Sequence, residues 1–297
     1  MSATKNKLRT IFSRIHFYYK ISHLFLMGKK TGPEEYSRDY DIVSSKYDRL
    51  WVKNMGKYTE EMLGRLAPRG NQRILDVGCG TGYITGAVKR ECPSCYVLGI
   101  DNSRQMLEIA KMNNSLPKTD FILGDALEEI EKLPDDSFDM ITFGWTLIYF
   151  DSKKVLREAH RILKKGGKIG VITNRKGTIR SIEDSFIRLM KIHPQKISLI
   201  DDIALRLPSG LNSIKRSFKQ SGFQFIDGWE KEQTFNFNNG SDAVKWAKEC
   251  GALAGTFKIL DINDFAVPLA EELEKHHKKN NQIRVTHRFI VGVGEKC

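Results

Sequence analysis

The stretch that decides the fold is Arg73-Ile-Leu-Asp-Val-Gly-Cys-Gly-Thr-Gly-Tyr-Ile-Thr85. An apolar run that carries one acid, Asp76, stops at three glycines in alternate positions, and helix-like spacing of apolar residues follows. This order predicts a strand, a tight loop and a helix, the opening unit of a nucleotide-binding α/β fold. Glycine permits a positive φ and a close approach of the backbone to a ligand, and the first N–H groups of the helix face that ligand.

The glycine spacing differs from that of dinucleotide-binding proteins. Those proteins carry Gly-x-Gly-x-x-Gly with a pyrophosphate at the helix N-terminus, whereas here Tyr83 stands where their third glycine would fall. Asp76, just before the loop, would repel a pyrophosphate and suits a ligand with a cationic end. The pattern therefore disfavours an NAD-dependent dehydrogenase.

Four further segments follow the glycine loop in order. The apolar run Val97 to Ile100 ends in Asp101, an acid that can accept hydrogen bonds from both hydroxyls of a ribose. Asn102 and Ser103 then begin a helix. The remaining segments are Phe121 to Ala126, Phe138 to Tyr149, and Leu156 to Thr173, which contains a helix, a Gly-Gly turn and a strand.

Together these segments resemble the class I S-adenosylmethionine-dependent methyltransferases, closely over residues 74–173. The resemblance implies S-adenosylmethionine as cofactor, with the glycine motif on its methionyl part, Asp101 on its ribose and Asp125 on its adenine amino group. The implied cofactor-binding residues are Asp76, Gly78, Cys79, Gly80, Gly82, Asp101, Asn102, Met106, Asp125, Ala126, Phe143 and Gly144.

The resemblance also implies an α/β fold: a Rossmann-like, doubly wound sheet of seven strands whose last strand is antiparallel. We expect a helical N-terminal extension over residues 1–66 and a methyltransferase core over residues 67–297. Within that core, residues 176–208 carry an amphipathic pattern that predicts a helical insertion acting as a lid. At 297 residues the chain is long enough to bury a sizeable core.

The net charge limits the kinds of partner that the protein can have, and the cysteine content indicates its cellular compartment. The formal net charge is +12, which fits nucleic acid, an anionic membrane, an anionic substrate or a solvated lysine-rich surface. Five cysteines without framework spacing favour a reducing, cytoplasmic location. We interpret Cys92-Pro-Ser-Cys95 as an ordinary connector rather than a redox pair or zinc site, and we expect no metal.

Residues 1–30 form a segment of their own, rich in lysine, arginine and large apolar residues and free of acids. Such a segment can be a helix of the lid, a peripheral membrane contact or an organelle-targeting peptide, and the sequence leaves all three open. No apolar run is long enough for a transmembrane helix.

The loop after the fourth strand, Phe143-Gly-Trp-Thr146, bears on the methyl acceptor. It lacks the prolines typical of nucleobase-modifying relatives, which makes nucleic acid an unlikely partner and favours a small-molecule or lipid-like acceptor. That acceptor can be amphiphilic, such as a quinone, an isoprenoid or a lipid head group. No catalytic residue is assigned; the candidates for the acceptor pocket are Tyr47, Trp145, Thr146, Tyr149 and Asn174.

Two alternatives to this function remain. An RNA or protein methyltransferase is favoured only by the net charge. A non-catalytic scaffold that keeps the fold is opposed by the intact motif residues Asp76, Asp101 and Asp125.

Overall fold

A computed structural model gives the backbone of residues 2–262 and 264–297 and the side chains of residues 12–262 and 264–297. The chain divides into two compact units. The sheet unit comprises Tyr40–Thr178, Leu205–Gln233 and His287–Cys297, and the helical unit comprises Met1–Asp39, Ile179–Ala204 and Thr234–Thr286. The expected division into an extension over residues 1–66 and a core over residues 67–297 with an insertion at 176–208 stays a prediction.

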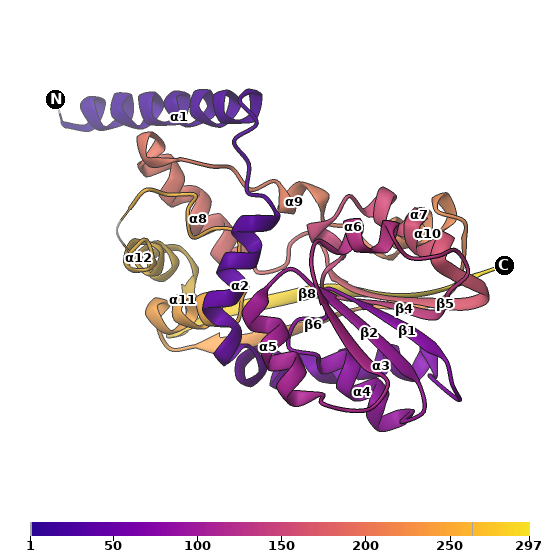
Figure 1. Cartoon of the computed structure of the whole chain (residues 1–297). Coiled ribbons are helices and arrows are strands. Elements are labelled where there is room, and N and C mark those ends of the chain that lie inside the picture. The colour runs from indigo at the N-terminus through magenta and orange to yellow at the C-terminus, as the bar shows by residue number, and fades with distance from the viewer. Residues whose placement is uncertain (1, 263) are drawn as a thin grey trace. The chain divides into compact units, whose positions relative to one another are not determined.

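The elements alternate between helix and strand through the middle of the chain (Figure 1). The strands are β1 (Arg73–Val77), β2 (Tyr96–Asp101), β3 (Thr119–Leu123), β4 (Phe138–Gly144), β5 (Leu163–Asn174), β6 (Phe223–Phe237), β7 (Lys278–Lys279) and β8 (Gln282–Lys296). The helices are α1 (Ser2–Leu26), α2 (Pro33–Tyr47), α3 (Lys53–Leu66), α4 (Tyr83–Glu91), α5 (Arg104–Asn113), α6 (Ala126–Glu131), α7 (Ser152–Ile162), α8 (Arg180–Ile192), α9 (Ile203–Arg206), α10 (Leu211–Gln220), α11 (Gly240–Glu249) and α12 (Ala266–His277). Short turns of other helix types are η1 (Asp48–Val52), η2 (Leu147–Tyr149) and η3 (Pro194–Lys196).

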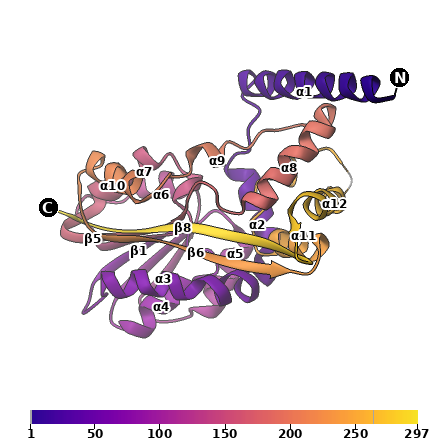
Figure 2. The same ribbon diagram turned by 180° about the vertical axis from the view of Figure 1, so that it is seen from behind.

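The strands form one sheet in the order β3-β2-β1-β4-β5-β8-β6, with the two-residue β7 paired to β8. The pairs β2–β3, β1–β2, β1–β4 and β4–β5 are parallel, and β8 is antiparallel to β5. Helices α6, α7 and α10 cover one face of the sheet and α3, α4 and α5 the other, as both views show (Figure 2). The expected doubly wound sheet, its antiparallel last strand and the helical additions are confirmed.

The core explains why these segments become buried strands. Apolar side chains of β1, β2, β4 and β5 are fully enclosed, including Leu75, Ile100, Ile141 and Val171. Strands buried on both faces of a parallel sheet carry such continuous apolar runs. Burying each of these side chains stabilises the fold by roughly 1.5–3 kcal/mol.

The Gly-Gly pair lies inside β5 rather than before it. Leu163 pairs with Phe138 and the next paired residue is Lys168, opposite Met140, so the register shifts between them. Gly166 in this irregularity has a φ of 74°. The expected turn is therefore a bulge in a longer strand, because both flanks find partners on β4.

In the helical unit, α8 and α12 pack together and α12 packs on α11. The ring centroids of Phe186 and Phe265 lie 5.7 Å apart in this packing. The predicted insertion is thus helical, while its function as a lid stays a prediction. The sequence also predicts a helix start at Asn263 or Asp264; Asn263 lies outside the described residues, and α12 begins at Ala266. Among the described residues, no helix is both long and apolar enough to cross a membrane.

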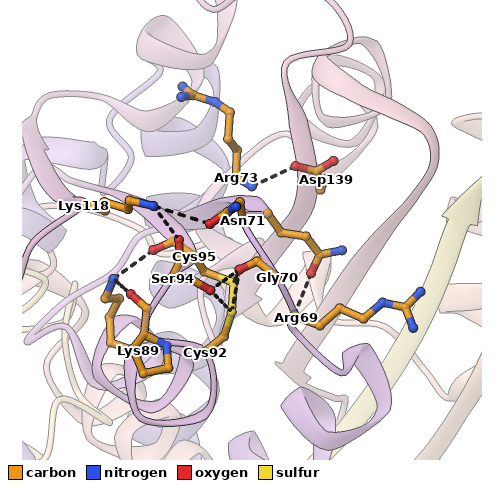
Figure 3. The surroundings of a disulfide bond; sticks show 12 residues. Arg69, Gly70, Asn71, Arg73, Lys89, Cys92, Ser94, Cys95, Lys118 and Asp139 are labelled. Atoms are coloured by element: carbon orange, nitrogen blue, oxygen red, sulfur yellow. Dashed lines mark hydrogen bonds between the residues drawn. A yellow bond between two sulfur atoms is a disulfide. The ribbon is translucent and has the colours of Figure 1, made fainter.

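The connector between α4 and β2 is closed by a disulfide between Cys92 and Cys95 (Figure 3). The interpretation as an ordinary connector rather than a redox pair is right about its place between helix and strand but missed this bond. The ammonium group of Lys89 fills the same turn and donates to the carbonyl oxygens of Pro93, Cys95 and Pro117 at 2.7, 2.8 and 2.9 Å. Burial lowers the pKa of Lys89. The turn lies at the C-terminal end of α4, and the glycine loop lies at its N-terminal end. The disulfide and Lys89 therefore hold the C-terminal end of this helix in place.

Candidate functional site

The glycine loop between β1 and α4 folds back onto the end of β2. Gly78, Gly80 and Gly82 have φ values of 68°, 55° and 79°. The N–H groups of Gly78 and Cys79 donate to the carbonyl of Ile100 at 2.8 and 3.0 Å. These bonds place the predicted methionyl and ribose motifs next to each other, as expected of parallel strands that end at one edge of a sheet.

The three glycines differ in the space around them. A Cβ on Gly78 would lie 2.5 Å from Cγ2 of Thr146, and one on Gly82 would lie 2.4 Å from Nδ2 of Asn114. A Cβ on Gly80 would meet nothing within 4 Å. Gly78 and Gly82 therefore serve the packing of the protein itself, whereas Gly80 borders open space in which a ligand can approach the backbone.

Substituting these glycines should separate folding from binding. Gly80→Ala should lower the free energy of unfolding by only about 1 kcal/mol, the cost of a left-handed alanine, yet weaken cofactor binding. Gly78→Ala should lose more stability, because its Cβ also collides with Thr146. Urea unfolding and calorimetric titration with S-adenosylmethionine measure the two effects. Equal stability losses in both variants, or full binding by Gly80→Ala, would contradict this assignment.

Asp101 ends β2 and organises the loop through both carboxylate oxygens. Oδ2 accepts from the N–H of Gly80 and Oδ1 from the N–H of Ser103, each at 2.8 Å. Burial raises the pKa of this carboxyl. An ionised carboxylate has about four lone-pair sites, so capacity remains for a ribose hydroxyl beside the backbone N–H groups of Gly80, Asn102 and Ser103. Asn102 follows directly, while the Met106 side chain is buried and its N–H donates to Oγ of Ser103 at 3.2 Å.

Asp76 is buried beneath the loop rather than exposed beside it. Its Oδ2 accepts from the hydroxyl of Thr85 and its Oδ1 from that of Thr142, both at 3.0 Å. Burial, partly offset by these bonds, raises its pKa to about 6. The carboxyl thus joins β1, α4 and β4, and its action on the cationic end of the cofactor stays a prediction. The Cys79 thiol is also buried, which raises its pKa.

The raised pKa of Asp76 predicts a pH dependence of stability. Folding favours the protonated acid, so its contribution is fully present below the ordinary pKa of 3.8 and is lost as the pH rises through about 6. The loss should be roughly 3 kcal/mol. Urea unfolding of the wild type and of Asp76→Asn between about pH 4 and pH 7 isolates this contribution. The two curves should converge towards low pH; parallel curves would refute the assignment.

The other predicted cofactor residues support the fold around the loop, and their contacts with the cofactor stay predictions. Asp125 caps α6, with Oδ1 accepting from the N–H groups of Leu127 and Glu128 at 2.9 and 3.2 Å, and Ala126 is buried behind it. The Phe143 side chain belongs to the core. A Cβ on Gly144 would lie 2.4 Å from Cδ1 of Ile84, so this glycine lets α4 approach β4.

Trp145, the first residue after β4, is held in an unusual conformation. Its φ is 69°, a left-handed value that is uncommon for a bulky residue. Its indole Nε1 donates to the hydroxyl of Thr59 at 3.2 Å, and its ring lies 5.2 Å from that of Trp51 and 5.1 Å from that of Phe289. Backbone strain retained by such contacts is a feature of functional sites.

Aromatic rings continue from Trp145 across the segment before α3. Tyr40 and Tyr149 share a hydrogen bond of 2.6 Å between their hydroxyls, and Tyr47 lies between the rings of Tyr40 and Trp51 at 6.1 and 6.4 Å. We call this set the aromatic cluster: Tyr40, Tyr47, Trp51, Trp145, Tyr149 and Phe289. It brings together three of the predicted acceptor residues, Tyr47, Trp145 and Tyr149.

Thr146 and Asn174, the other two acceptor candidates, differ in how their polar atoms are used. The Thr146 hydroxyl donates to the carbonyl of Val77 at 2.8 Å, which holds the glycine loop. Asn174 ends β5, and its buried Oδ1 has no hydrogen-bond donor within the described part of the chain. The buried Nε1–H of Trp51 likewise finds no acceptor within that part of the chain. Buried polar atoms left in this way favour a ligand at this end of the sheet.

His287 on β8 also lies against the aromatic cluster. Its ring lies 4.9 Å from that of Trp51, and its Nδ1 is 3.3 Å from the Thr178 hydroxyl. Burial lowers its pKa to about 3, so the imidazole is neutral at physiological pH. Analysis of the sequence alone did not single out Tyr40, His287 or Phe289, since no local pattern distinguishes them from core residues.

Two acids fasten the segment before α3 to the loop. Oδ1 of Asp41 accepts from the Ser103 hydroxyl at 2.5 Å and from the N–H of Gln105 at 3.0 Å. Asp48 accepts from the Thr81 hydroxyl at 2.5 Å, and burial raises its pKa. The segment carrying Tyr40 and Tyr47 is thereby held beside both cofactor motifs. Of the two acids, Asp41 was not singled out in the sequence.

Comparison with known proteins identifies this arrangement. Residues 75–171, from β1 to β5, match the family model described as a methyltransferase domain. These residues form a class I S-adenosylmethionine-dependent methyltransferase domain. S-Adenosylmethionine is accordingly its cofactor, and when bound it supplies a methyl group on a sulfonium. The open space at Gly80 and the remaining acceptor capacity of Asp101 fit this group.

Two curated relatives of this methyltransferase share one name. Demethylmenaquinone methyltransferase of Thermotoga maritima is 34% identical over 153 residues, covering 49% of this chain and 64% of the relative. The chain thus spans less than two thirds of that protein. Demethylmenaquinone methyltransferase of Staphylococcus aureus strain JH9 is 29% identical over 220 residues, covering 67% of this chain and 88% of the relative.

Solved structures share the fold at low sequence identity. A protein from Bacillus halodurans C-125 described as a methyltransferase has a TM-score of 0.56 at 17% identity, covering 81% of this methyltransferase and 99% of that chain. The [4+2]-cyclase SpnF has a TM-score of 0.59 at 19% identity, covering 90% and 97%. Because a cyclase shares the architecture, the fold alone does not specify the reaction of a member.

Proposed function

We propose that this methyltransferase transfers a methyl group from S-adenosylmethionine to a small amphiphilic acceptor with a flat ring, of the demethylated quinone class. The aromatic cluster beside the glycine loop carries the proposal. Its rings come from the end of β4, from β8 and from the segment held by Asp41 and Asp48. The names of the Thermotoga and Staphylococcus relatives, both demethylmenaquinone methyltransferases, support the same acceptor class.

Aromatic walls suit this chemistry for two physical reasons. Rings pack on a planar acceptor in offset or edge-to-face geometry, each pair adding about 0.5–1.5 kcal/mol beyond its buried area. Holding donor and acceptor in line can supply about 7–11 kcal/mol of the barrier. In addition, the charge on sulfur disappears during transfer, so an apolar surrounding disfavours the charged starting state more than the transition state.

The tail of the proposed acceptor bears on where in the cell the enzyme acts. A quinone with an isoprenoid tail resides in a bilayer, so the proposal includes peripheral contact with a membrane through residues 1–30. That segment contains lysine and arginine and no acid, which fits an anionic surface.

The experiment supplies methyl-labelled S-adenosylmethionine and a demethylated 1,4-naphthoquinol with a short side chain. We expect label in the organic extract, bound to the ring. The matched control is the same quinol with the ring position already methylated, which should take up no label. Transfer instead to phosphatidylethanolamine, RNA or protein would overturn the quinone assignment, as would equal labelling of both quinols.

A further inference from the structure

Helix α1 is held to the helical unit by one of its faces. Phe17 and Leu24, seven residues and two helical turns apart, are both buried. The Ser13 hydroxyl donates to the carbonyl of Lys191 at the end of α8, and the Lys191 ammonium lies 5.6 Å from the centre of the Phe17 ring. This face therefore belongs to the packing of α1 on α8 and η3.

The opposite face of α1 carries large apolar side chains that contact little. Phe12, Ile15, Tyr19 and Leu26 are 69%, 61%, 68% and 84% exposed. Their separations of three, four and seven residues place them on one stripe of the helix. We call this stripe the docking face. A contiguous stripe of this kind is a feature of interaction sites rather than of an ordinary solvated surface.

The charge of the sequence that carries the docking face indicates its partner. Residues 1–30 contain seven cationic side chains and no aspartate or glutamate: Lys5, Lys7, Arg9, Arg14, Lys20, Lys29 and Lys30. A second copy of the chain would bring the same positive charge against them, whereas anionic lipid would neutralise it. Tyr18 and Tyr19 are both exposed, and tyrosine is favoured at the level of lipid head groups.

We propose that α1 docks on an anionic lipid bilayer, lying in the plane of the interface with the docking face among the head groups and upper acyl chains. Helices of this kind embed their apolar face by about 5–10 Å. The inference adds to the proposed function the place where the enzyme meets an acceptor dissolved in a bilayer. The exposure of the docking face and the charge of residues 1–30 do not depend on which acceptor the enzyme methylates.

The test is flotation of the full chain with vesicles of phosphatidylcholine mixed with phosphatidylglycerol, and with vesicles of phosphatidylcholine alone. We expect binding to the mixed vesicles, weakened by added salt. Ile15→Ser combined with Leu26→Ser should reduce this binding about tenfold or more. The matched control, Met112→Ser combined with Leu205→Ser, removes side chains that are 74% and 76% exposed in the sheet unit and should leave binding unchanged.

Two other readouts keep the outcomes separate. Transfer of methyl to the short-chain naphthoquinol, which needs no bilayer, should be the same in the α1 variant and the wild type. If that transfer fails in both while flotation succeeds, the acceptor assignment falls and the docking proposal stands. Unchanged flotation of the α1 variant would overturn the docking proposal, and so would wild-type self-association through α1, seen by light scattering, with no vesicle binding.

Discussion

Asp101→Ala should weaken the binding of S-adenosylmethionine by about 1–3 kcal/mol, roughly 5- to 150-fold. The substitution removes the acceptor proposed for the ribose hydroxyls. It also leaves the N–H of Gly80 without its bond of 2.8 Å and the N–H of Ser103 without its own. Because the carboxylate fixes the loop as well as the ligand, we expect the upper part of this range. Calorimetric titration of the purified variant measures the change.

Asp139→Ala is the matched control for this experiment. Asp139 also caps the backbone of a neighbouring strand, since its Oδ2 accepts from the N–H of Arg73 at 2.8 Å. Arg73 begins β1, so this bond lies at the edge of the sheet opposite the glycine loop. The control should lose a similar amount of stability and keep its affinity for the cofactor. Full cofactor affinity in a folded Asp101→Ala protein would refute the placement of the ribose motif.

Trp145→Ala should reduce kcat/KM for the demethylated naphthoquinol by about 100-fold or more, while the affinity for S-adenosylmethionine changes little. The indole contacts Trp51, Phe289 and the hydroxyl of Thr59. Its removal would loosen the proposed acceptor wall, and a misplacement of about 1 Å can cost such a factor. Steady-state kinetics with labelled cofactor, together with calorimetric titration, separates the two effects.

The backbone conformation of Trp145 allows a second variant, Trp145→Gly, to be compared with Trp145→Ala. With a φ of 69°, Trp145→Gly should be more stable than Trp145→Ala by about 1 kcal/mol, since glycine adopts this region freely. Both should lose activity alike if the ring is what matters. Trp229→Ala, which removes an indole 5.9 Å from the Arg65 guanidinium, is the matched control and should keep full activity. An equal loss of kcat/KM in Trp229→Ala would show a general effect of stability instead.

Several features of the fold and site could be predicted from local patterns. The apolar run, the three glycines and the helix that follows predicted β1, the loop and α4, because turns with positive φ demand glycine and buried parallel strands demand apolar runs. Asp101 could be recognised because its position at the end of β2 follows from the same periodicity. Its contact with Gly80 then arises from the ordinary geometry of two adjacent parallel strands.

Other local predictions failed for identifiable reasons. The Gly-Gly pair became a bulge because β4 offers partners on both sides of it. The cysteine connector became a disulfide because the turn brings the two Cα atoms to 5.5 Å, which spacing alone does not reveal. The assignment of Thr146 to the acceptor pocket stays a prediction, and the structure adds that its hydroxyl donates to the carbonyl of Val77.

The sequence by itself determined the strand, the glycine loop and the helix that follows, since these are encoded by residues close together in the chain. The doubly wound sheet and the S-adenosylmethionine cofactor followed from the family resemblance over residues 74–173. Only the tertiary structure decided which side chains surround the loop. Tyr40 and Tyr149, 109 residues apart, share a hydrogen bond, and Asp41 caps a backbone group 64 residues away. Such contacts depend on how α2, β4 and β8 are packed, and no periodicity of the chain records that packing.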